Sequence, residues 1–168
     1  MLEEKVINEI CEWIDTRIIK TSKPIISTGV PSGVHGFGFI TVSKVEEDLD
    51  ANNETFAEVL MKYLDKKNIS NVDCYSHANI TKETFSKIYS GKTKYPKREN
   101  VALLAISLKL DINEYHDFIE AASYASSRDK TDPLNIVEYF IERGEYDLLN
   151  IEEAVLKITG KYLASTYE

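Results

Sequence analysis

Residues 69–110 decide the fold, and they read ISNVDCYSHANITKETFSKIYSGKTKYPKRENVALLAISLKL. Ser70 and Thr81 each precede a short helical pattern, and each hydroxyl can accept a hydrogen bond from a free N–H of the first turn. Asn79 lies between the two patterns, where the chain must reverse and where Asn tolerates a left-handed backbone. Gly91 ends the second pattern, and a third apolar pattern follows a short loop. The stretch therefore predicts three short helices joined by tight turns.

The same stretch resembles the phage-repressor type (lambda-repressor-like) of helix-turn-helix domain. The pattern of that family is apolar–Ser–Gln–x–x–Leu–Ala–x–x–x–Gly–Ile–Ser, then x–x–Thr–Ile–Ser–x–Ile–Glu–x–Gly, then a proline and an apolar helix. Here residues 69–81 read ISNVDCYSHANIT and residues 84–92 read TFSKIYSGK, and the resemblance covers about residues 54–124. Asn71, Tyr75 and Tyr89 depart from the pattern, since the family has Gln, Ala and Glu there. The resemblance implies a mainly α fold that binds double-stranded DNA sequence-specifically.

The second helical pattern has one polar face. A helix that enters the major groove needs an N-terminal turn that is free of bulky apolar groups and rich in hydrogen-bond donors. Phe85 and Ile88 fall on the core side, three residues apart. The opposite face consists of Thr81, Lys82, Glu83, Ser86 and Lys87. By resemblance, the four residues of this face that follow Thr81 would meet base edges, where Lys can donate to guanine and Glu can accept from cytosine.

Basic residues cluster after this helix. By resemblance, the side chains that would lie along the DNA backbone as phosphate contacts are Lys92, Lys94, Lys97 and Arg98, and Asn71 would add a contact from the preceding helix. Residues 59–110 carry ten basic and four acidic side chains, although the whole chain has a net charge of −8. A basic centre between acidic flanks indicates a nucleic-acid partner, and lysines that merely solvate a surface are the alternative.

Residues 1–50 form a first segment, with an amphipathic helix at residues 2–20 and a possible β-hairpin after it. The glycine-rich loop of that hairpin spans residues 29–38 and lacks the third glycine of a dinucleotide-binding fingerprint, because Thr41 occupies its place. The loop is therefore predicted to be a flexible connection and not a nucleotide site.

Two further segments follow. By resemblance, residues 54–124 are expected to form the helix-turn-helix domain, and Asn52 or the Asn that follows it is expected to cap its first helix. Residues 132–160 are expected to form a C-terminal helical extension that packs on this domain. Its last helix is expected to be capped by Asn150.

The helix at residues 2–20 predicts a homodimer. Its apolar face is wide and contains Val6, Ile7, Ile10, Cys11, Trp13, Ile14, Ile18 and Ile19. This face exceeds what one contact on a small domain needs, so we expect two copies to meet here with Trp13 near the centre of the contact. Two-fold symmetry would also let two recognition helices read half-sites about one helical turn apart. Ordinary packing in the core of one chain is the alternative.

No motif indicates catalysis, a metal site or a cofactor. Residues 90–93 read SGKT, like the end of a P-loop, but Ser86 stands where its first glycine should be, and a helix is expected to end here, not begin. Cys74 and His77 lack a second pair of metal ligands nearby. We therefore do not expect an enzyme.

The remaining features concern location and partners. No apolar run is long enough to span a membrane and the acidic N-terminus is unlike a signal peptide, so a cytoplasmic protein without a membrane partner is expected. The leading expectation is a DNA-binding transcription regulator. The alternative is a helical interaction module that keeps the fold but docks a protein partner through Tyr75, Tyr89 and the acidic C-terminal helices.

Overall fold

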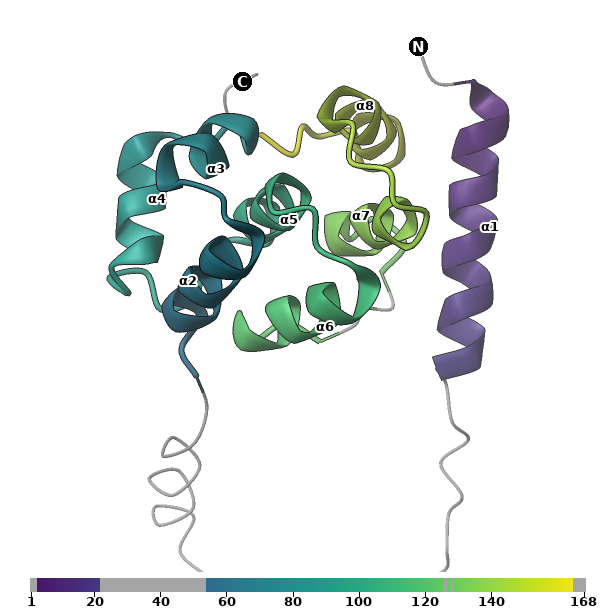
Figure 1. The fold of residues 1–168 in the computed structure, drawn as a ribbon. Helices are drawn as coiled ribbons and strands as arrows, with labels where there is room; N and C mark the ends of the chain where they lie inside the picture. Colours follow the sequence, from purple (N-terminus) through teal and green to yellow (C-terminus); the bar gives the residue numbers. More distant parts are fainter. Residues whose placement is uncertain (1–2, 22–53, 126, 128, 165–168) are drawn as a thin grey trace, which may run out of the picture.

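The computed structural model describes residues 3–21, 54–125, 127 and 129–164, which form eight helices and no strand (Figure 1). The helices are α1 (Glu4–Thr21), α2 (Phe56–Lys67), α3 (Asn71–His77), α4 (Lys82–Tyr89), α5 (Arg98–Ser107), α6 (Ile112–Ala121), α7 (Pro133–Glu142) and α8 (Leu148–Thr159). The chain is therefore mainly α, as predicted. The possible β-hairpin and its loop at residues 29–38 lie outside the described residues. Among the helices that are described, none is long and apolar enough to cross a membrane.

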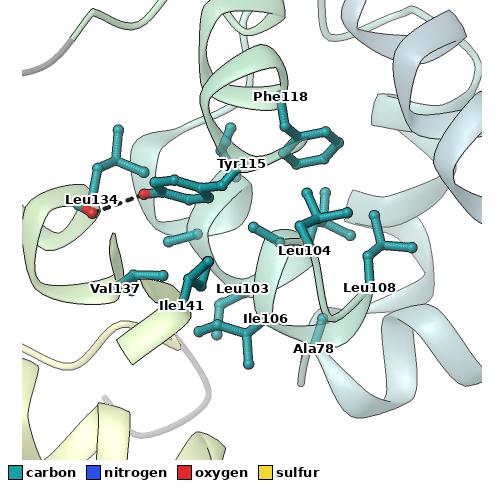
Figure 2. Packing of buried hydrophobic residues seen from close by; sticks show 14 of the residues in the cluster. Ala78, Leu103, Leu104, Ile106, Leu108, Tyr115, Phe118, Leu134, Val137 and Ile141 are labelled. Carbon is teal, nitrogen blue, oxygen red and sulfur yellow. Dashed lines mark hydrogen bonds between the residues drawn. The ribbon is translucent and has the colours of Figure 1, made fainter. Parts of the chain in front are cut away.

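Helix α5 lies at the centre of the fold, where it packs against α3, α6 and α7 (Figure 1). Residues 101–107 of this helix are all buried, as expected of a helix that is apolar on every side. Figure 2 shows the core around it, in which the hydroxyl of Tyr115 on α6 donates a 2.8 Å hydrogen bond to the carbonyl of Leu134 on α7. One apolar core therefore continues from α2–α6 into α7 and α8.

Helix α1 packs against α7 and α8 (Figure 1). Ile10 and Ile14 are buried as part of the core. The Trp13 ring lies edge-on to Tyr139 of α7, with 5.6 Å between the ring centroids. The Tyr139 hydroxyl donates a 2.9 Å hydrogen bond to the Glu9 carboxylate. Much of the apolar face on which the dimer prediction rests is therefore already in contact with the chain's own core.

Two predicted helix caps are wrong. The helix expected after Asn52 begins after Thr55, which is its N-cap, because Thr55 and Glu58 exchange hydrogen bonds between side chain and backbone in both directions. Asp147 caps α8 in place of Asn150, since its carboxylate accepts hydrogen bonds from the N–H groups of Leu149 and of Asn150 itself. In both cases another residue that can cap a helix lay within a few positions of the expected one, and that residue is the N-cap.

Candidate nucleic-acid interface

Helices α3 and α4 are joined by residues 78–81. The hydroxyl of Ser70 accepts a 3.1 Å hydrogen bond from the N–H of Asp73, and the hydroxyl of Thr81 accepts one of 3.2 Å from the N–H of Thr84. Asn79 has a φ of 53°, the left-handed conformation expected where the chain reverses. Both predicted caps and the predicted turn residue are confirmed, so the start of α4 is held by hydrogen bonds between near neighbours in the chain.

The inner face of α4 packs through aromatic rings. Phe85 and Ile88 are buried. The Phe85 ring contacts Tyr75 of α3 and Tyr89 of α4, with centroid distances of 5.7 and 5.8 Å. Tyr75 replaces a small residue of the family pattern, and its half-buried ring is accommodated by this contact with Phe85. The two tyrosines that the interaction-module alternative invokes are therefore partly engaged within the chain.

The outer face of α4 carries the side chains expected to meet base edges. All four are exposed, namely Lys82, Glu83, Ser86 and Lys87, as is the N-cap residue Thr81 beside them. Neither Lys82 nor Lys87 forms an ion pair with any residue in the described part of the chain. This face therefore presents two ammonium groups, the Glu83 carboxylate and the Ser86 hydroxyl to a ligand, while the Thr81 hydroxyl is engaged with Thr84.

The loop between α4 and α5 presents a second set of cations. Gly91 has a φ of 72°, which reverses the chain after α4, and the N–H of Thr93 donates a 3.0 Å hydrogen bond back to the carbonyl of Lys87. The exposed lysines of this loop are Lys92, Lys94 and Lys97. The Lys94 ammonium lies 5.3 Å from the centroid of the exposed Tyr95 ring, a cation–π contact. Asn71 is exposed at the first position of α3.

The side chain of Arg98, the first residue of α5, engages other parts of the fold. Its guanidinium forms an ion pair with Asp132, which precedes α7, and lies 4.5 Å from the centroid of the Tyr124 ring. The expectation that Arg98 serves as a phosphate contact does not account for these partners. Sequence spacing gave no sign of the ion pair, since Asp132 lies 34 residues from Arg98.

Other cations of the basic centre are also paired. Lys66 and Lys67, at the end of α2, lie 2.8 and 2.6 Å from the carboxylate of Glu114 on α6. Lys62 pairs with Glu54 at 3.3 Å. Several cations of the basic centre are thus paired within the fold, whereas Lys82 and Lys87 on α4 form no ion pair with the described residues.

A cleft of about 920 Å³ lies beside this loop, between the start of α2 and the end of α6. Its lining includes charged groups of both signs, such as Lys94 and Glu120, and therefore does not select one ligand charge. Among the described residues, no three His, Cys, Asp or Glu side chains converge as metal ligands. Burial raises the pKa of the Cys74 thiol to about 11, so that this thiol is not a reactive nucleophile at neutral pH.

Comparison of the chain with models of protein families, with curated proteins and with solved structures gave no match. A function for this chain is therefore inferred from the geometry of α3, α4 and the loop that follows.

Proposed function

We propose that the protein is a sequence-specific DNA-binding regulator of the phage-repressor helix-turn-helix type, with α3 and α4 as the two helices of the motif. The observation that carries the proposal is the outer face of α4. It is exposed, it lacks bulky apolar groups, and Lys82 and Lys87 on it have no ion-pair partner among the described residues. These are the properties that a helix needs to enter the major groove.

In this proposal α4 reads bases and the adjacent segments hold the duplex. Lys82 and Lys87 donate hydrogen bonds to the oxygen and nitrogen of guanine. Glu83 accepts a hydrogen bond from the amino group of cytosine, and its carboxylate is repelled by the DNA where no such donor faces it. The three lysines of the loop after α4 contact phosphates, as does Asn71 at the start of α3. Contacts to phosphate give affinity and register, and contacts to bases give sequence preference.

A homodimer is part of the proposal, because two copies of α4 could then read half-sites about one helical turn apart. The contact was expected at residues 2–20. Since Ile10 and Ile14 of α1 are buried in the chain's own core, the dimer would use the half-buried side chains of that helix, such as Ile7 and Cys11.

Duplex binding tests the proposal directly. A pool of random-sequence duplexes is titrated with the full-length protein at several salt concentrations, and binding is followed by fluorescence anisotropy. The three loop lysines of each protomer predict a slope of log K against log salt of about −2.7 for every protomer bound. Lys161 follows α8 in the chain and is exposed, so Lys161→Ala removes one positive charge that belongs neither to α4 nor to the loop after it, and it is the matched control for Lys87→Ala.

We expect Lys87→Ala to weaken binding to the preferred sequence and Lys161→Ala to leave it nearly unchanged. Absence of duplex binding by the wild type at low salt would exclude the proposal and leave the interaction module as the function to pursue.

A further inference from the structure

The loop of residues 90–97 is tied to the rest of the fold at its far end. Pro96 is buried, and its carbonyl accepts a 2.7 Å hydrogen bond from the hydroxyl of Tyr124. The guanidinium of Arg98, the first residue of α5, lies over the same tyrosine ring and forms an ion pair with Asp132. Arg98, Tyr124 and Asp132 therefore link the end of the loop to the segment that precedes α7.

Asp132 uses both of its carboxylate oxygens in this region. Oδ1 accepts a 3.0 Å hydrogen bond from the N–H of Leu134 and thereby caps α7, while Oδ2 faces Arg98. The side chain of Asp132 is only 5% exposed, so departure of Arg98 would leave a buried carboxylate without its cation. Removing one partner of a buried ion pair is strongly unfavourable. The same cost opposes any movement of Arg98 toward a DNA phosphate.

We propose that Arg98 is a positioning residue for the basic loop and not a phosphate contact. Through Tyr124 and Asp132, it holds the three lysines of the loop in place to follow the DNA backbone. This inference rests on the proposed function, since it concerns the same interface. It also gives the acidic start of α7 a role that favours DNA binding in spite of its charge.

Asp132→Asn distinguishes a positioning role of Arg98 from a phosphate contact, because the two roles predict opposite changes in DNA affinity. Asn is as good an N-cap as Asp, so the start of α7 is kept while the ion pair is lost. A positioning role predicts weaker binding to every duplex, with a salt slope shallower by more than about 0.9, because more than one loop lysine loses its phosphate. A phosphate contact predicts tighter binding, because Arg98 is released and a negative charge is removed. The matched control is Asp65→Asn on α2, which removes an exposed carboxylate that forms no ion pair with any described residue.

A second variant and a measurement without DNA complete the test. Tyr124→Phe keeps the ring under Arg98 and removes only the hydroxyl that bonds to Pro96. The amide of Thr93 reports on the loop, since it donates to the carbonyl of Lys87. We expect faster hydrogen exchange at Thr93 in both variants of the free protein, in excess of any change in global stability.

The outcomes separate this inference from the proposed function. If the wild type binds no duplex, both fail. If the wild type binds and Asp132→Asn binds equally or more tightly, the positioning role fails while the proposed function stands. An unchanged rate of hydrogen exchange at the Thr93 amide in both variants also overturns the positioning role. If Asp132→Asn does not fold, the DNA affinity and the Thr93 exchange rate of Tyr124→Phe provide the test.

Discussion

Glu114 offers the sharpest test of how the helices of this fold are held together. Its side chain is 7% exposed and receives hydrogen bonds from Lys66 and Lys67 of α2 and from the N–H of Asp111, the N-cap of its own helix. Burial alone would raise the pKa of the Glu114 carboxyl. The hydrogen bonds from the two lysines and from Asp111 outweigh burial and lower the pKa to about 2.

The magnitude follows from linkage between protonation and folding. An unperturbed Glu has a pKa of about 4.3, so a depression of roughly 2 pKa units corresponds to about 3 kcal/mol of stability at neutral pH. Because the Lys66 side chain is 59% exposed and its charge is screened by water, we expect about 2 kcal/mol in practice. Since the pKa is depressed in the folded state, this stability is present above about pH 4.3 and is lost as the pH falls toward 2.

Glu114→Gln removes the charge while Gln keeps the capping box with Asp111. The free energy of unfolding is measured by urea titration of both proteins at a series of pH values from neutral downward. We expect the wild type to be more stable by about 2 kcal/mol at pH 7 and the difference to shrink steadily below about pH 4. Glu54→Gln is the control, since Glu54 and Lys62 form an exposed pair that contributes at most about 1 kcal/mol. A difference that stays constant from neutral pH to the acid limit of folding would refute this account of Glu114.

Three further predictions concern the interface and assembly. Thr81→Ala removes the cap of α4 and should lower the free energy of unfolding by about 1 kcal/mol, measured by urea titration. Lys87→Ala should change which duplex sequences are preferred, at a cost of about 1–3 kcal/mol at one base pair, whereas Lys94→Ala should weaken binding to all duplexes alike. Selection from a random pool measures both, and a uniform loss of affinity in both variants would show that Lys87 reads no base. Sedimentation at micromolar concentration should show a dimer, and Trp13→Ala should weaken its association by about 2 kcal/mol or more. If the wild type is instead a monomer and Trp13→Ala only lowers its stability, α1 serves the core of its own chain.

The features that the sequence predicted well depend on near neighbours in the chain. Ser70 and Thr81 cap their helices through N–H groups three residues away, and Asn79 adopts the left-handed conformation that its side chain tolerates. The division of α4 into a buried and an exposed face follows from helical spacing alone. Even here, the start of α2 was misplaced by a few residues, and Thr55 caps it through a reciprocal pair of hydrogen bonds with Glu58.

What only the tertiary structure decided is which charges find partners. Arg98 meets Asp132 across 34 residues of chain, and Tyr139 meets Glu9 across 130. The sequence determined that α4 would carry lysines and that residues 92–98 would be basic, because composition and helical period are local properties. It could not determine that Arg98 faces the fold while the lysines beside it face water, because ion pairing depends on how α5 and α7 pack, and that packing is set by the core they share.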